Sequence, residues 1–267
     1  MRRPELKDRH GEQLPRLFFS IPYHSIMPTL GVKRQIDNEY SKVMNKKELE
    51  KVMDSVISAT FIRLSNVYKN HKENTNSSPK TPTSEGSRLV FPMYGEHRDN
   101  STRISEQELR FAFVESFNEY CNTNHLNLFY SVETPTRMKT YSGTSTKKPR
   151  NDDYEKGDSA NFDLVILDEK LNRACLIEFK ANNSDLNDHK KDLLKLNNIN
   201  EGHENVLRYF IEVIKTYNDK TLNSLRNKLM ENRDLKAFFK CYALEGKSQR
   251  GKIRKDGEDI SDKIILQ

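Results

Sequence analysis

The chain has 267 residues, of which 34% are hydrophobic and 31% are charged, with a formal net charge of +6 and a pI near 9.0. A mean hydropathy of −0.87, and no apolar run near the roughly 20 residues of a membrane span, argue against a membrane protein. The charged, proline-containing start also lacks a signal-peptide core, so we expect a soluble cytoplasmic protein with no membrane partner. The basic balance fits a nucleic-acid partner without proving one.

Several enzyme classes lack their usual motifs in this sequence. The cysteines, Cys121, Cys175 and Cys241, lie far apart and mostly inside apolar segments, which predicts buried free thiols rather than a disulfide framework or a zinc cluster. No His-x-x-x-His or Cys-x-x-Cys pair occurs, which argues against zinc hydrolases and Cys/His nucleophiles. A phosphate-binding P-loop is also missing, so a built-in NTPase motor is not expected.

Residues 1–95 are predicted to form an N-terminal extension, mostly helical, that precedes a core at 96–267. The clearest element of the extension is a helix over 45–68, where apolar residues recur at helical spacing. This helix has three interpretations, namely packing against the core, dimerisation, or a DNA-binding arm. After it, residues 71–88 have the polar, Ser/Thr/Pro-rich composition of a linker.

The first helix of the predicted core begins with a capping box. Ser105 is the N-cap, and Glu108 stands three residues further on. Apolar residues at helical spacing then predict a helix over 105–121. Three glutamates line up around it, because Glu115 and Glu119 each fall within about 20° of Glu108.

A strand is predicted over 126–133, followed by a long basic loop over 134–157. The loop gathers five residues that we expect to bind nucleic acid: Arg137, Lys139, Lys147, Lys148 and Arg150. A flexible basic loop can hold the phosphates of a substrate and release their counterions. The alternative interpretation is a solvated loop without such a role.

Two apolar runs, 162–167 and 174–180, are typical of buried strands, and the short polar segment between them suits a hairpin turn. The first run is interrupted only by Asp163, near its start. Glu178 lies near the end of the second run. An antiparallel pairing would therefore bring Asp163 beside Glu178.

Glu178 and Lys180 point to the same side of their strand because side chains alternate with a period of two. Asp163 and Glu178 would then supply the hard oxygen ligands that Mg²⁺ prefers, and Lys180 would orient or deprotonate the attacking water. Glu-x-Lys also occurs at Glu5 and Glu245, but only the copy at Glu178 ends an apolar run. The alternative is an edge hairpin whose charges face solvent.

Asp163 followed by Glu178-Phe179-Lys180 resembles the motif of the PD-(D/E)XK nuclease superfamily, although Phe162 stands where that motif usually has proline. The resemblance covers about 105–246. It implies a restriction-endonuclease-like fold of the α/β (α+β mixed) class, with a central mixed sheet flanked by helices. It also implies nucleic-acid hydrolysis with Mg²⁺ as cofactor and Mn²⁺ as a substitute.

The resemblance further implies a metal ligand at the Phe179 carbonyl and an acid on the helix before the first core strand. For that acid we expect Glu115 first, as a catalytic residue and metal ligand, and Glu108 second. In the alternative interpretations, Glu108 only completes the cap and Glu115 is a solvated carboxylate.

The expected activity is that of a metal-dependent endodeoxyribonuclease, of restriction-endonuclease or phage-defence type. Fold-level analogy adds a homodimer that cuts both strands. Two alternatives remain open. One is a nuclease fold that binds nucleic acid or a partner protein without cleavage, and the other is a nuclease directed at RNA.

Downstream, Ser184 is predicted to cap a helix, and two further amphipathic helices are predicted over 204–217 and 222–239. A short strand is predicted over 241–244. The chain would end in a basic tail that follows this strand.

Overall fold

The structure, a computed structural model, describes residues 44–74, 87–91, 103–137, 160–182, 184–202, 205–230, 236–249, 252–253 and 257–265. The chain divides into two compact units, Met1–Val43 and Met44–Gln267, and every described residue belongs to the second.

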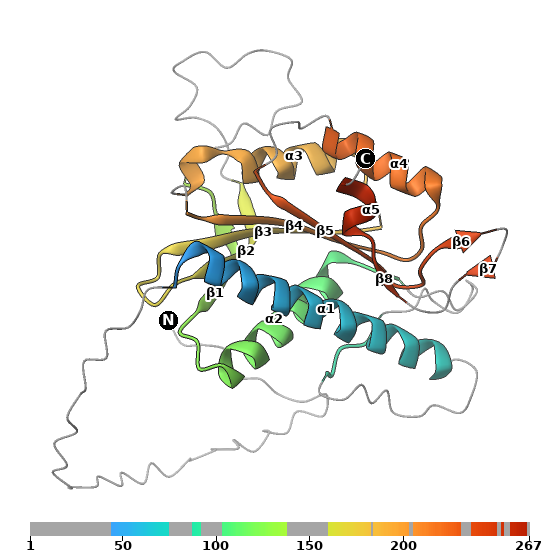
Figure 1. The fold of residues 1–267 in the computed structure, drawn as a ribbon, viewed down its shortest axis with the longest axis horizontal. Helices are drawn as coiled ribbons and strands as arrows, with labels where there is room; N and C mark the ends of the chain where they lie inside the picture. Colours follow the sequence, from blue (N-terminus) through green and yellow to red (C-terminus); the bar gives the residue numbers. More distant parts are fainter. Residues whose placement is uncertain are drawn as a thin grey trace, which may run out of the picture. The chain divides into compact units, whose positions relative to one another are not determined.

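A six-stranded mixed sheet forms the centre of this second unit, in the order β1-β2-β3-β4-β5-β8 (Figure 1). Strands β1, β2 and β3 form an antiparallel meander, β4 and β5 run parallel to β3, and β8 closes the far edge antiparallel to β5. A separate two-stranded ribbon joins β6 and β7. The strands are β1 Phe129–Pro135, β2 Asn161–Leu167, β3 Arg173–Ala181, β4 Leu207–Ile214, β5 Phe238–Ala243, β6 Ser248–Gln249, β7 Lys252–Ile253 and β8 Glu258–Asp259.

Helices cover both faces of the sheet, α1 and α2 on one side and α3, α4 and α5 on the other (Figure 1). This confirms the predicted mixed α/β class with a central sheet flanked by helices. None of these helices has both the length and the apolarity needed to cross a membrane. The helices are α1 Lys46–Asn74, α2 Glu106–Thr123, α3 Leu186–Asn197, α4 Asp219–Met230 and α5 Ser261–Ile265, with a 3-10 turn, η2, at Ile199–Glu201.

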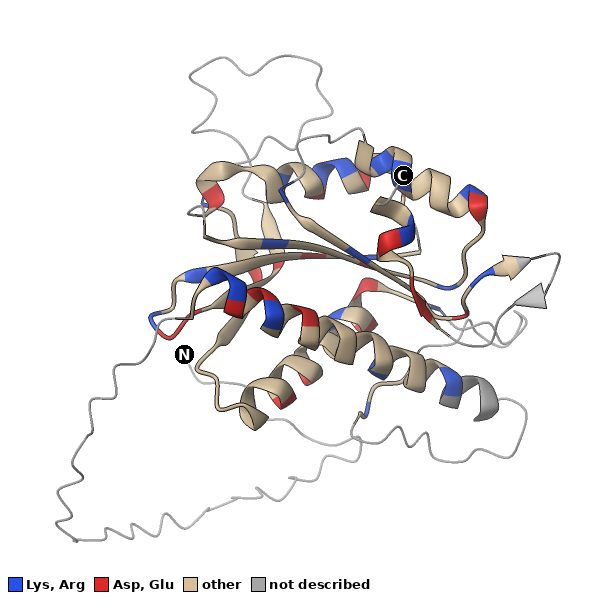
Figure 2. Cartoon of the chain, in the orientation of Figure 1, with Lys and Arg blue, Asp and Glu red and all other residues tan. Residues whose placement is uncertain are grey.

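Two apolar clusters lie on the two faces of the sheet. Ile177 and Phe179 of β3 point into the cluster shared with α1 and α2, whereas Leu176 points into the cluster shared with α3, α4 and α5. In Figure 2 the central strands carry few charged residues, while the helices carry both signs. The few charged side chains of the sheet therefore lie among apolar neighbours, and several of them lie at one end of β2 and β3.

The predicted hairpin is confirmed. Strands β2 and β3 pair antiparallel through Leu164↔Ile177 and Val165↔Leu176, and their bounds agree with the predicted runs within one residue. The capping box of α2 is also present, because the Ser105 backbone N–H donates to Glu108 Oε2 at 2.8 Å. The N-cap of α3 is Asp185 rather than the predicted Ser184.

The helix predicted over 204–217 is wrong, because this segment contains β4. Every residue of β4 is buried. A parallel strand covered by helices on both faces has no solvent side, so its sequence lacks the alternation that would distinguish it from a buried helix. The helix predicted over 222–239 likewise runs too far, since α4 ends at Met230 and β5 begins at Phe238. The strand predicted over 241–244 is the second half of β5.

Helix α1 packs on the sheet within the same compact unit, which is the first of the three interpretations of the helix predicted over 45–68. Its Phe61 ring stacks on Tyr242 with centroids 4.8 Å apart. Its Tyr68 hydroxyl donates to Glu245 Oε1 at 2.5 Å, and Asp54 pairs with Lys240 of β5 at 2.9 Å. The compact unit that contains the sheet thus begins at Met44, and the division into an extension and a core near 95 stays a prediction. Of the predicted linker, 71–74 belong to α1, and 75–86 lie outside the described residues.

We predict that Met53→Ala, at a fully buried position of α1, lowers the free energy of unfolding by about 2–5 kcal/mol because it leaves a cavity beneath the helix. Ile62→Ala on the same helix is the control. Its side chain is 61% exposed, so we expect a change within about 0.5 kcal/mol. Urea denaturation followed by circular dichroism measures both, and equal effects would contradict the packing of α1 on the sheet.

Candidate active site

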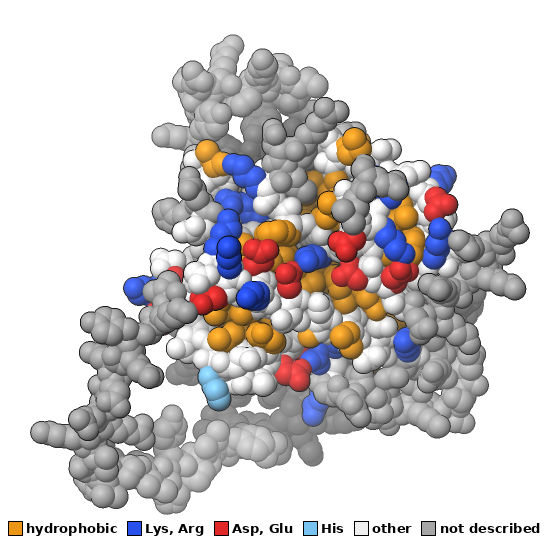
Figure 3. Space-filling model, viewed as in Figure 1, with side chains coloured by type: hydrophobic (Ala, Val, Ile, Leu, Met, Phe, Trp, Pro, Cys, Tyr) orange, Lys and Arg blue, Asp and Glu red, His pale blue; other side chains and the backbone are white. Residues whose placement is uncertain are grey.

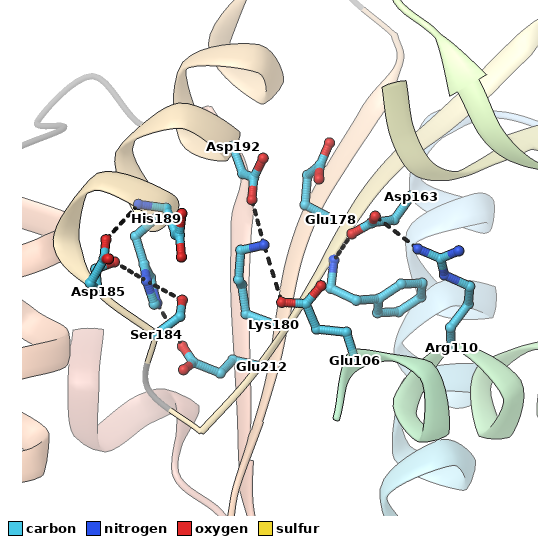
Figure 4. Close-up of polar contacts among 12 residues, drawn as sticks. Glu106, Arg110, Asp163, Glu178, Lys180, Ser184, Asp185, His189, Asp192 and Glu212 are labelled. Carbon is cyan, nitrogen blue, oxygen red and sulfur yellow. Dashed lines mark hydrogen bonds and ion pairs between the residues drawn. The ribbon is translucent and has the colours of Figure 1, made fainter. Parts of the chain in front are cut away.

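The candidate site lies where β2 and β3 separate. Their paired residues end at Leu164↔Ile177, and one residue further along each strand stand Asp163 and Glu178. The Asp163 carboxylate reaches across the gap, and its Oδ2 accepts a hydrogen bond from the Phe179 backbone N–H at 2.7 Å. Figure 4 shows Asp163 and Glu178 close together, between α3 and α2. The hairpin thus brings the two predicted acids together, as its register requires.

Arg110 of α2 neutralises Asp163. One guanidinium nitrogen, Nη2, lies 2.9 Å from Asp163 Oδ1, and the other, Nη1, lies 2.6 Å from Glu133 Oε1. The Arg110 and Asp163 side chains are only 12% and 16% exposed. Both oxygens of Asp163 therefore have partners, one a guanidinium and the other a backbone amide.

Glu178 is fully buried, and its carboxylate is poorly satisfied. Lys195 Nζ lies 2.8 Å from its Oε1, which is an ion-pair distance, but neither carboxylate oxygen has a hydrogen bond of good geometry. Burial, followed by the charges of Asp192 and Asp163, raises the pKa of Glu178 well above its usual value. A divalent cation bound by these oxygens would supply the coordination that they lack.

Lys180 points to the same side as Glu178 and pairs with two carboxylates (Figure 4). Its Nζ lies 2.7 Å from Asp192 Oδ2 and 3.3 Å from Glu106 Oε1. Burial alone would lower the pKa of Lys180, but these carboxylates outweigh it and raise the pKa above its usual value. Lys180 is therefore an ammonium at neutral pH, which favours the orienting and electrostatic part of its predicted role over proton abstraction.

Helix α3 supplies the second wall of the site. Asp192 bridges both amines, because its other oxygen, Oδ1, lies 2.9 Å from Lys195 Nζ. Lys195 also donates to the Asn161 carbonyl at 2.8 Å. Burial works to lower the pKa of Lys195, but Glu178 and Asp192 outweigh it and raise this pKa. The network therefore runs as a chain of alternating charges from Glu106 to Glu178.

A second polar cluster lies beside this network, at the start of α3. His189 Nε2 is 3.0 Å from Glu212 Oε2, and its Nδ1 is 3.0 Å from Ser184 Oγ and 3.1 Å from the Asp185 carbonyl. Glu212 of β4 is the register partner of Lys180. Both His189 and Glu212 are buried, so this cluster fixes the start of α3 against the sheet.

Glu115 and Glu108 lie elsewhere. Glu115 accepts from Ser87 Oγ at 2.6 Å and pairs with Arg63 of α1 at 3.2 Å, which places it in the contact between α1 and α2. Glu108 completes the capping box. The acid that α2 brings to the site is Glu106, whose pKa is raised by burial, with partial compensation by Lys180.

Four residues of the site were not found by sequence reasoning: Glu106, Arg110, Asp192 and Lys195. A signal existed for the first two, because a spacing of four residues places them on one face of α2. The pattern of glutamates aligned at 108, 115 and 119 led instead to the face that meets α1. Asp192 and Lys195 are three residues apart on α3, and their burial depends on the position of β4, which the sequence did not predict.

The donors fit a divalent cation in part. Across the described ranges, no group of three or more His, Cys, Asp or Glu side chains has metal-binding geometry. Asp163 and Glu178 do offer hard oxygen donors on neighbouring strands, and the buried oxygens of Glu178 have no hydrogen bond of good geometry. These two residues could hold Mg²⁺. A ligand role for the Phe179 carbonyl stays a prediction. The Phe179 ring packs edge-on against Phe113 in the core, with ring centroids 5.5 Å apart.

Of the residues predicted to bind nucleic acid, only Arg137 is described. It is exposed just after β1, and its backbone N–H donates to Glu201 Oε2 at 2.7 Å. Figure 3 shows acidic and basic side chains interspersed across the visible face, between apolar patches. The other predicted residues, Lys139, Lys147, Lys148 and Arg150, lie outside the described residues.

We predict that Glu178 contributes a loss of stability to the metal-free protein as pH rises above the usual pKa of glutamate. The pKa of Glu178 is raised on folding, so the folded protein keeps a proton that the unfolded chain releases. Stability then falls until the pH reaches the raised pKa. Urea unfolding across pH, in chelator, should show a shallower decline for Glu178→Gln than for wild type. Glu119→Gln, at a side chain 71% exposed, should leave the slope unchanged.

Comparison with known proteins adds no relative to this picture. No family model, no curated protein and no solved structure matches the chain. The function is therefore inferred from the geometry of the site and from the motif that its residues form.

Proposed function

We propose that this chain is a Mg²⁺-dependent nuclease that hydrolyses phosphodiester bonds in DNA. The observation that carries the proposal is the meeting of Asp163, Glu178 and Lys180 at the divergent end of β2 and β3. Two carboxylates adjoin there, and an ammonium stands on the same side of the strand. This combination of cation ligands and positive charge near the phosphate suits metal-assisted phosphodiester cleavage.

Asp163 and Glu178 would hold the cation, which when bound polarises the phosphate and lowers the pKa of water. Lys180, kept protonated by Asp192 and Glu106, would orient the attacking water and stabilise the negative charge that develops on the phosphate. Glu106 would hold Lys180 from the side of α2. Arg110, which pairs with Asp163, would orient the Asp163 carboxylate toward the cation.

The order of elements supports a restriction-endonuclease-like core. Helix α2 precedes β1, β2 carries the aspartate and β3 carries Glu178-Phe179-Lys180, the order that the resemblance implies. Strands β4 and β5 then add parallel to β3. A restriction or phage-defence role, a homodimer that cuts both strands, Mn²⁺ as a substitute and a cytoplasmic location accompany this proposal as predictions.

A second candidate is a nuclease fold that binds nucleic acid or a partner without cutting. The ion pairing within the site favours it, because Arg110, Lys180 and Lys195 already neutralise the acids that would receive a metal. If a metal ion cannot displace these positively charged side chains from the acids, the site is a structural network of ion pairs. Cleavage assays separate the two candidates.

We predict that the purified protein cleaves DNA in the presence of Mg²⁺ or Mn²⁺ and that Lys180→Ala lowers the rate by about 100-fold or more. Asp163→Asn and Glu178→Gln should remove cleavage while the circular dichroism spectrum stays native. Lys240→Ala is the matched control, since Lys240 is also an ion-paired strand lysine but pairs with Asp54 on α1. The assay uses supercoiled plasmid, linear duplex, single-stranded DNA and RNA.

The substrate panel also decides among the alternatives. Cleavage of RNA alone would move the proposal to an RNA-directed nuclease. Retained binding in gel shifts, with every substrate intact in both metals, would favour the non-cleaving candidate and overturn the proposed activity.

We predict that Glu106→Gln slows cleavage by about 10-fold or more, because Lys180 loses one of its two carboxylate partners. Glu115→Gln should leave the cleavage rate near wild type and instead weaken the contact between α1 and α2, seen as a lower midpoint of urea unfolding. Single-turnover rates and unfolding curves of both variants test this assignment. The reverse pattern would restore Glu115 as the acid of the site.

A further inference from the structure

We propose that Lys195 is a built-in counterion that occupies the cation position at Glu178, so that a divalent metal binds only by displacing its ammonium group. This inference rests on the proposed function, because it concerns the metal site of that activity. It assigns to α3 a role in metal loading that neither the motif nor its spacing contains.

The first observation is the contact itself. Lys195 Nζ lies 2.8 Å from Glu178 Oε1, and Glu178 is fully buried. The two carboxylate oxygens have no hydrogen bond of good geometry, so the ammonium offsets their charge without satisfying their lone pairs. A divalent cation coordinated by these oxygens would replace a weak partner with a stronger one.

The second observation is that Lys195 has other partners that could retain it. Its Nζ is 2.9 Å from Asp192 Oδ1 and 2.8 Å from the Asn161 carbonyl. If the ammonium left Glu178, these oxygens could still hold it beside the site. The flexible lysine stem permits such a shift. The displaced amine would thus stay buried with a carboxylate partner rather than lose all compensation.

The third observation is the overall charge of the network. Five carboxylates, Asp163, Glu133, Glu178, Asp192 and Glu106, meet three cations, Arg110, Lys180 and Lys195. A fully ionised set of five acids and three cations carries a net charge of −2. Removing the charge of Lys195 would make that net charge −3, which attracts a divalent cation more strongly, and would free Glu178.

The test measures Mn²⁺ binding directly, by calorimetry on the full chain without substrate, at a pH where wild-type affinity no longer changes with pH. Lys195→Met and Lys195→Gln remove the charge; methionine keeps a long apolar side chain, and glutamine keeps a hydrogen-bond donor. We expect both to bind Mn²⁺ on the order of tenfold more tightly than wild type, the effect of removing one nearby like charge. Lys195→Arg and Lys240→Met should bind like wild type.

Thermal unfolding gives a second readout that needs no activity. In chelator the two neutral variants should melt below wild type, because Glu178 loses its counterion. Mn²⁺ should then raise their melting temperature more than it raises that of wild type, by mass action on the folded state. If neither variant folds without metal, refolding in Mn²⁺ replaces calorimetry, and rescue supports the proposal whereas no rescue overturns it.

The outcomes separate this inference from the proposed function. Tighter binding without any cleavage would support the role of Lys195 and overturn the nuclease. Cleavage by wild type, with equal or weaker Mn²⁺ binding in both neutral variants, would overturn the role of Lys195 and leave the nuclease in place. No Mn²⁺ binding to any variant would overturn both.

Discussion

The buried carboxylate of Glu178 imposes the main electrostatic constraint on this end of the molecule. Burying a charged group costs roughly several kcal/mol unless an opposite charge is buried beside it. Lys195 accompanies Glu178, Asp192 accompanies Lys195, and Lys180 follows in turn. Each burial makes the next partner necessary, so the network ends only at Glu106, where the side chain reaches 37% exposure.

This constraint explains why helices from opposite faces meet around one pair of strands. Along β3, Glu178 and Lys180 face α3, while Phe179 between them packs toward α2. The strands separate beyond Leu164↔Ile177, and through that gap Arg110 and Glu106 of α2 reach the same charges. The apolar core on one side therefore fixes the position of the polar groups on the other.

The local parts of the fold could be predicted from the sequence, and the parts set by distant contacts could not. The hairpin and the start of α2 follow from patterns within about 20 residues. Strand β4 could not be distinguished from a helix, because its burial on both faces comes from helices distant in sequence. The same dependence on distant contacts limited the prediction of the site. Asp163, Glu178 and Lys180 were found from one hairpin, whereas Asp192 and Lys195 required knowing how α3 lies on β3 and β4.

The capping box at Ser105 and Glu108 has a consequence beyond the stability of α2. Glu106 is the first residue of α2, and the cap satisfies backbone N–H groups of the first turn that have no partner within the helix. Fraying of this turn would release Glu106 from Lys180. Glu108, whose side chain accepts from the Ser105 backbone N–H, therefore helps to hold Glu106 beside its lysine partner.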